Sequence, residues 1–198
     1  MANKEKTNYD SITEAMLPEK GTEYYNDFQL SLERDSVFQL TPLELLRDEK
    51  FGDEHMDCQR RYDSMPRFGA IGGGMSVTFI IPDDGLRRVV SRCEGCEHEY
   101  EITEGNINGN EYDAIVDDNV PDDPEEKADY LKKIYWGRTY SMNEVEYLRF
   151  LKFKEDYAGV PDKGNLMVTF RGTGLGNLVS VRYSNIDTVY DITDCTHW

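Results

Sequence analysis

The placement of its β-rich segments most constrains the fold of this chain. Residues 75–81 and 86–92 have β-rich composition and flank a Pro-Asp-Asp-Gly turn at 82–85, which predicts a β-hairpin. Residues 97–103 alternate between polar and apolar side chains and predict another strand, and a short strand is also expected at residues 112–116. Three more strands are expected near the end of the chain, at residues 166–171, 178–183 and 188–192. Strands that gather in this way, without regular alternation with helices, predict an α+β fold built mainly of antiparallel sheet and hairpins.

Helix signals lie before and between these strands. Thr41, Pro42 and Glu44 form an N-terminal capping pattern for a helix that carries Leu43, Leu45 and Leu46. Ser141 and Glu144 have the spacing of a second capping box, which opens a helix that runs to about Ala158. Two shorter helices are expected at residues 53–62 and 125–136, so the prediction is three to four helices.

The domain organisation follows from the same patterns. Residues 1–35 are mostly polar without a sustained period, and we interpret them as an N-terminal arm that packs on the body or on another subunit. Residues 36–198 are long enough for one α+β domain. We find no internal repeat by inspection of the sequence.

Charge is the strongest compositional feature, with a formal net charge of −17 over 198 residues. Residues 94–130 contain fourteen acidic side chains against one lysine, whereas residues 60–92 have a net charge of +3. Phosphate groups repel such a chain, so direct binding to nucleic acid or to anionic lipid is not expected. A partner with a basic surface fits this charge, as does solubility at high concentration.

Hydropathy and cysteine content bear on the compartment. No run of about 18 apolar residues is present, so no membrane span is expected. Residues 1–10 are polar and lack the apolar centre of a secretory signal. Four cysteines are too few for a disulfide scaffold, and reduced thiols are expected. We therefore expect a cytoplasmic location, which for a viral protein means the host cytoplasm or the virion.

Two pairs of residues have the spacing of zinc ligands. Cys93 and Cys96 form a C-x2-C pair between two predicted strands, and His55 and Cys58 form an H-x2-C pair on a predicted helix. One histidine and three cysteines can complete a tetrahedral structural zinc site. His98 and the terminal pair Cys195 and His197 are alternatives for the fourth ligand.

Several motifs of known enzymes are missing or misplaced. The glycine-rich runs at 69–74 and 172–176 lead into predicted strands, whereas a phosphate-binding loop leads into a helix. The sequence has no G-x-S-x-G motif for a serine nucleophile. The acidic run at 117–126 lacks the spacing of an EF-hand loop. These features favour a protein that is not an enzyme.

Three functions remain as hypotheses. The first is a non-enzymatic structural or protein-interaction subunit, such as a phage virion or assembly component, which docks on other proteins and can form a homo-oligomer. The second is an acidic inhibitor, either an immunity or an anti-defence protein, that mimics nucleic acid on a basic partner. The third is a small metal-dependent enzyme that uses the Cys and His residues.

Overall fold

The structure is a computed structural model, and it describes residues 9–63, 74–83, 85–104, 123, 125–126, 139–173 and 175–196. The elements of the first half are η1 (Tyr9–Ser11), η2 (Glu14–Met16), α1 (Glu23–Asp35), β1 (Val37–Gln39), α2 (Pro42–Glu54), α3 (Met56–Asp63), β2 (Met75–Ile81), β3 (Arg88–Cys93) and β4 (Glu99–Glu101). Those of the second half are β5 (Thr139–Ser141), α6 (Glu144–Asp156), β6 (Leu166–Gly172), β7 (Asn177–Tyr183) and β8 (Tyr190–Asp191). None of the helices in the described residues has the length and apolar character needed to cross a membrane.

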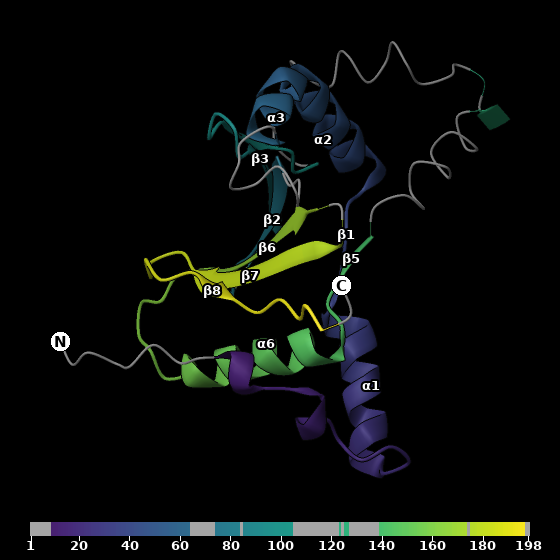
Figure 1. Cartoon of the computed structure of the whole chain (residues 1–198), viewed down its shortest axis with the longest axis vertical. Coiled ribbons are helices and arrows are strands. Elements are labelled where there is room, and N and C mark those ends of the chain that lie inside the picture. The colour runs from purple at the N-terminus through teal and green to yellow at the C-terminus, as the bar shows by residue number, and fades with distance from the viewer. Residues whose placement is uncertain are drawn as a thin grey trace.

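The described strands form two antiparallel sheets. The large sheet has the strand order β4-β3-β2-β6-β7-β8, and the small one pairs β1 with β5. In Figure 1, α2 and α3 lie at the β3 end of the large sheet, whereas α6 lies along the β7–β8 end with α1 beside it. The predicted α+β class, with mainly antiparallel sheet, is therefore confirmed.

The core fills the face of the large sheet that α2 and α6 cover. Alternate residues of the four central strands are almost fully buried there, namely Val77, Phe79, Val89, Val168, Phe170, Val179 and Val181. Aromatic rings of the small sheet close the centre: Phe38 lies 5.2 Å from Phe79 and 5.3 Å from Phe170, measured between ring centroids. This burial is the main stabilising contribution to the fold.

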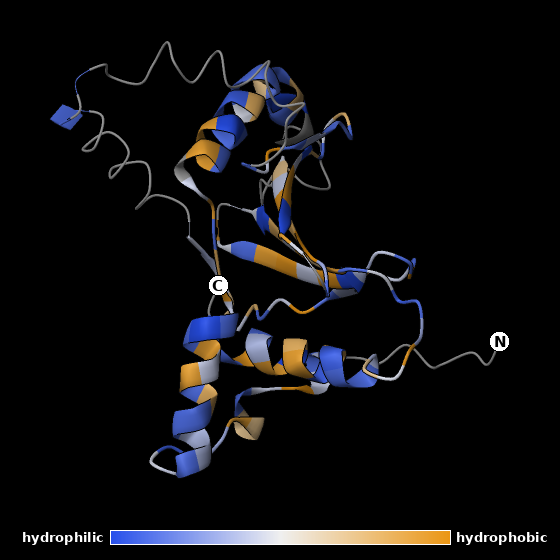
Figure 2. Cartoon of the chain, turned by 180° about the vertical axis from the view of Figure 1, so that it is seen from behind, coloured by the Kyte–Doolittle hydropathy of each residue, from blue (hydrophilic) through white to orange (hydrophobic). Residues whose placement is uncertain are grey.

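Several elements differ from the sequence prediction. Helix α6 begins after Asn143, whose side chain accepts from Glu146 N while Glu146 caps Asn143 N, so the capping box is two residues later than predicted. The polar segment before residue 36 contains helix α1, which is largely hydrophilic in Figure 2 and buries only Phe28. Strands β1 and β5 were not predicted from the sequence. The strand expected at 112–116 lies outside the described residues, as does nearly all of the helix expected at 125–136.

The two halves of the large sheet have the same strand order. From the edge to the centre, one half is β4-β3-β2 and the other is β8-β7-β6. In the central β2–β6 pair, Thr78 lies opposite Thr169, with Val77 opposite Phe170 and Phe79 opposite Val168. The segment Val-Thr-Phe thus pairs with a second copy of itself. In the small sheet, Phe38 lies opposite Tyr140, also at the centre of the pair. The central residue pairs of the two sheets, Thr78–Thr169 and Phe38–Tyr140, indicate an approximate two-fold axis that relates the two halves of the chain.

Buried polar contacts repeat with the same symmetry. Arg47 in α2 donates through Nη1 to Ile102 O at 3.2 Å and also to Thr103 O. Arg149 in α6 donates in the same way to Ile192 O at 3.2 Å and to Thr193 O. Both arginines are buried, and each holds the end of the last strand of its own half against the helix.

The chain therefore consists of two repeats, residues 9–104 and 139–196 of the described part. The expectation that the sequence has no internal repeat is wrong. Residues 100–104 (Tyr-Glu-Ile-Thr-Glu) and 190–194 (Tyr-Asp-Ile-Thr-Asp) are nearly identical and occupy equivalent places. The likeness of sequence also extends to residues 112–115 (Tyr-Asp-Ala-Ile), outside the described residues, which repeat residues 9–12 (Tyr-Asp-Ser-Ile).

Candidate metal centre

The joint between α2 and α3 positions His55 and Cys58. The backbone N–H of His55 donates to Phe51 O at 3.2 Å and so ends α2. The carbonyl of the same residue accepts from Gln59 N at 3.0 Å and so begins α3. Cys58 then lies in the first turn of α3, one turn from His55 and on the same side of the helix.

A tight turn between β3 and β4 positions Cys93 and Cys96. Cys93 is the last residue of β3; its carbonyl accepts from Glu97 N at 2.8 Å, and its N–H donates to His98 O at 2.9 Å. Glu97 has a φ of 61°, a left-handed conformation that residues other than glycine seldom adopt. This conformation turns the chain back into β4, so that both thiols lie on the inside of the turn.

Gly95 allows this turn to approach α3 closely. A Cβ atom on Gly95 would lie 2.7 Å from the carbonyl oxygen of Cys58 and 3.3 Å from Cys58 Cβ. A side chain at residue 95 would therefore push the turn away from the helix. The glycine makes it possible for two ligand pairs from different elements to meet.

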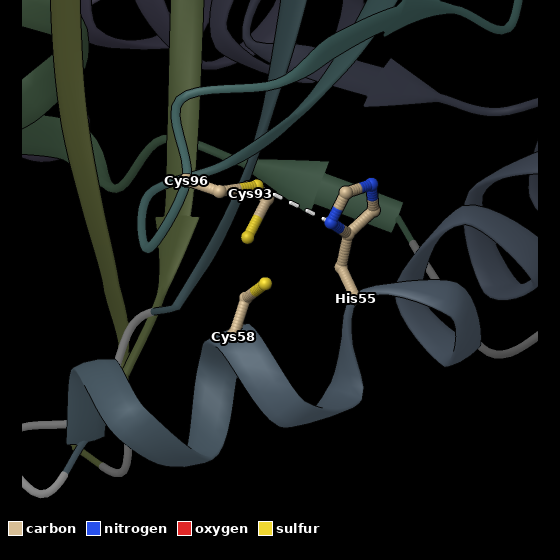
Figure 3. A group of neighbouring side chains, drawn as sticks. All are labelled: His55, Cys58, Cys93 and Cys96. Carbon is tan, nitrogen blue, oxygen red and sulfur yellow. Dashed lines mark hydrogen bonds between the residues drawn. The ribbon is translucent and has the colours of Figure 1, made fainter.

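The four predicted ligands lie together. The ligand atoms of His55, Cys58, Cys93 and Cys96 are all within 4.8 Å of one another, and they could hold a metal ion. Figure 3 shows the side chains of the helical pair and of the turn converging on one point. Cys96 Sγ lies 3.3 Å from His55 Nδ1. A zinc ion with Zn–S and Zn–N bonds of about 2.3 and 2.0 Å needs sulfur and nitrogen about 3.5 Å apart, so this edge fits.

Neighbouring rings hold the imidazole of His55 in place. Its Nε2 lies 3.0 Å from His98 Nδ1, and its ring packs on Phe51 with centroids 4.5 Å apart. If Nδ1 of His55 binds a metal ion, Nε2–H donates to His98, an arrangement that fixes the ring and its tautomer. His98 is thus placed to orient the candidate ligand His55 from outside the group of four.

Charges around the cluster suit a zinc–thiolate centre. Three thiolates, a neutral imidazole and Zn²⁺ have a net charge of −1, and Arg61 Nη2 donates to Cys58 Sγ at 3.6 Å. Burial, followed by the nearby His98, lowers the pKa of His55, which favours the neutral imidazole that metals require.

The acidic residues after Cys93 form ion pairs with one arginine. Arg92 Nη1 donates to Glu99 Oε1 at 2.6 Å, and its guanidinium also lies 3.8 Å from Glu94 and 4.0 Å from Glu97. Glu94 additionally accepts from Ser76 Oγ at 2.7 Å. These carboxylates thus form contacts beside the cluster, and the candidate metal ligands are the thiols and the imidazole.

Of the remaining alternative, the terminal pair, the structure describes only Cys195, which is not part of this cluster. Cys195 follows β8 and lies beside Asp191 and Asp194, and burial raises the pKa of its thiol. His197 lies outside the described residues. The acidic run at 117–126 also lies outside them, except for Asp123, Glu125 and Glu126; the Asp123 side chain accepts from the other two backbone N–H groups.

Comparison of the chain with protein-family models, with curated proteins and with solved structures finds no match in any of the three.

Proposed function

We propose that this protein is a non-enzymatic protein-interaction subunit whose fold is stabilised by one structural zinc ion. The observation that carries the proposal is the convergence of His55, Cys58, Cys93 and Cys96 within 4.8 Å. Four protein ligands complete a tetrahedron and leave no position for a water molecule or a substrate. A catalytic zinc ion keeps one such position open, so the donor set favours a structural role.

A cysteine–histidine catalytic pair is the competing interpretation of the same contact. Cys96 Sγ and His55 Nδ1 lie 3.3 Å apart, and His98 contacts the other nitrogen of the ring, as an orienting residue would. Such a pair needs one thiol, however, and here two more lie within the same 4.8 Å. Three thiols around one imidazole are accounted for by a metal ion and by no step of nucleophilic catalysis, so we prefer the zinc centre.

Exposed apolar side chains support a role in protein interaction. Leu86 at the tip of the β2–β3 hairpin is 88% exposed, and Leu175 at the tip of the β6–β7 hairpin is 60% exposed. Each leucine follows a glycine in an equivalent hairpin of its repeat. Tyr24 and Leu30 on α1 are also exposed. Large apolar side chains at these protruding places suit contacts with other subunits, including further copies of this chain.

The acidic-inhibitor hypothesis is less favoured. Mimicry of nucleic acid needs carboxylates that are free to meet a basic partner, whereas in the described part of residues 94–130 Arg92 forms ion pairs with Glu94, Glu97 and Glu99. Neutralising Asp117, Asp118, Asp122 and Asp123 together would test it. Loss of binding to a basic partner would favour the inhibitor, and unchanged binding would favour the interaction subunit.

Native mass spectrometry of the purified protein, before and after chelation, tests the proposal. One zinc ion per chain, absent from a Cys93→Ser/Cys96→Ser variant and retained by a Cys195→Ser control, is the expected result. The same spectra report the number of subunits. Rapid alkylation of a single hyper-reactive thiol in a protein that binds no metal would instead favour the catalytic pair.

A further inference from the structure

The metal centre has a counterpart in the second repeat that contains no metal ligands. His55 and Tyr157 are the C-terminal capping residues of the equivalent helices α2 and α6. Cys93 and Tyr183 are the last residues of the equivalent strands β3 and β7, and both are buried. The position of Cys96, three residues after Cys93, corresponds to Ile186, which packs against the core.

Backbone contacts support this correspondence. Glu94 N donates to Gly74 O at 2.9 Å at the end of β3, and Ser184 N donates to Asn165 O at 2.9 Å at the end of β7. The two turns therefore start from the same place relative to their neighbouring strands. Cys58 has no counterpart, because α3 occurs only in the first repeat and the chain after Tyr157 leads directly towards β6.

In the second repeat, aromatic side chains join the helix to the turn. The rings of Tyr157 and Tyr183 lie 5.8 Å apart, and Phe153 stacks on Tyr183 at 5.4 Å. The hydroxyl groups of Tyr157 and Tyr190 form a hydrogen bond of 2.6 Å. These contacts hold the end of α6 against the ends of β7 and β8 by burying aromatic rings.

The first repeat keeps part of this packing, since Phe51, the equivalent of Phe153, packs on His55 with ring centroids 4.5 Å apart. It lacks the contact between the two tyrosines, because the residues at the places of Tyr157 and Tyr183 are the smaller His55 and Cys93. A neighbouring pair is also polar in the first repeat and apolar in the second. Asp48 and Ser91 form a buried hydrogen bond of 2.5 Å, and their equivalents in the second repeat are Phe150 and Val181. The first repeat is thus more polar at the end where the four metal ligands converge.

We propose that the zinc centre takes, in the first repeat, the place of the contact between Tyr157 and Tyr183 in the second repeat, and that it holds the turn at 94–98 against the joint of α2 and α3. The inference rests on the proposed function, because it requires zinc at these four residues. It adds that the ion stabilises the first repeat selectively. Backbone amides of the first repeat that exchange through a local opening which releases the ion are protected by bound zinc. Removal of zinc should therefore speed up their exchange by the factor by which zinc binding had slowed it.

Hydrogen exchange of the full chain, with zinc and after chelation, tests the proposal without any substitution. We expect faster exchange in α2, α3, β3 and β4 after chelation, and unchanged exchange in α6, β7 and β8. Loss of zinc with unchanged exchange in the first repeat, or with an equal increase in both repeats, would overturn the inference and leave zinc binding intact. A chain that binds no zinc would overturn both proposals.

A substitution series gives a second, independent test. In the His55→Tyr/Cys58→Ala/Cys93→Tyr/Cys96→Ile variant, residues of the second repeat replace three of the ligands, and alanine replaces Cys58, which has no counterpart there. We expect it to bind no zinc, to have a Tm that does not change with a chelator, and to melt above the Cys93→Ser/Cys96→Ser variant. A Tm equal to or below that of the serine variant would contradict the proposed equivalence, and the exchange experiment decides independently if the replacement variant does not fold.

Discussion

Thr78 and Thr169 face each other across the central strand pair of the large sheet, with their hydroxyl oxygens 2.8 Å apart. They are equivalent residues of the two repeats, so this hydrogen bond lies on the approximate two-fold axis. A Thr78→Val substitution leaves the hydroxyl of Thr169 without this partner, and it should lower the free energy of unfolding by about 1 kcal/mol. The Thr78→Val/Thr169→Val double variant should lose much less than twice that amount, because both polar groups are removed.

Urea unfolding of the two single variants and the double variant measures this coupling as a double-mutant cycle. Strictly additive losses would show that the two hydroxyl groups do not act as a pair. Thr188→Val, in the stretch between β7 and β8, is the control, and it should change the free energy of unfolding only slightly.

His98 should tune the affinity of the metal centre without being a ligand. In the His98→Ala variant the imidazole of His55 loses its partner at Nε2, which lies 3.0 Å away in the wild-type chain. We expect zinc affinity to fall by about 10–100-fold while the stoichiometry stays at one ion per chain. Competition with a chromophoric zinc chelator measures both quantities. Complete loss of zinc would instead identify His98 as a ligand.

The close approach at Gly95 should be essential to the centre. A Gly95→Ala substitution places a Cβ atom 2.7 Å from the carbonyl oxygen of Cys58, so the turn or α3 must move. We expect weaker zinc binding and a lower Tm. Gly159→Ala is the matched control, because a Cβ atom there has no heavy atom within 4 Å. Equal effects of the two substitutions would contradict the role of the close approach.

Glu146 should make stability depend on pH in the mildly acidic range. Burial raises the pKa of its carboxyl group above the ordinary value of 4.5, although N–H groups of Asn143 and Asp194 oppose the shift. The folded state therefore binds this proton more tightly than the unfolded state does. The contribution of Glu146 to stability is fully present below the unfolded pKa and is lost as pH rises through the folded pKa.

A Glu146→Gln variant lacks this titration. The free energy of unfolding of the variant minus that of the wild type should therefore rise as pH increases through the range just above 4.5. Other titrating groups cancel in this difference, and Glu155→Gln, at a side chain that is 73% exposed, is the control. A difference that stays constant or falls with pH would show that burial of Glu146 does not raise its pKa.

Local signals in the sequence predicted local structure well. The turn at 82–85 correctly predicted the β2–β3 hairpin. Thr41 and Glu44 correctly predicted the start of α2, because the two hydrogen bonds of this capping box join residues only three positions apart. The second capping box was misplaced, because Ser141 and Asn143 are both suitable capping residues and only packing decides between them. Thr22 is a helix cap as well, since its side chain accepts from Tyr25 N, and this signal could have revealed α1.

Likeness between the repeats was too sparse to be recognised from the sequence. It is confined to short segments such as Val77-Thr78-Phe79 and Val168-Thr169-Phe170, because many different apolar residues satisfy the same buried position. The strand order made the repeat visible, since equivalent residues face each other in both sheets.

The sequence by itself determined the α+β class and the two candidate ligand pairs, because turn residues, capping residues and ligand spacing act over a few neighbouring positions. Only the tertiary structure decided that His55 and Cys58 meet Cys93 and Cys96. Their meeting depends on the α2–α3 joint, on the turn after β3 and on the close approach at Gly95, and these elements come together only when the chain packs around its core.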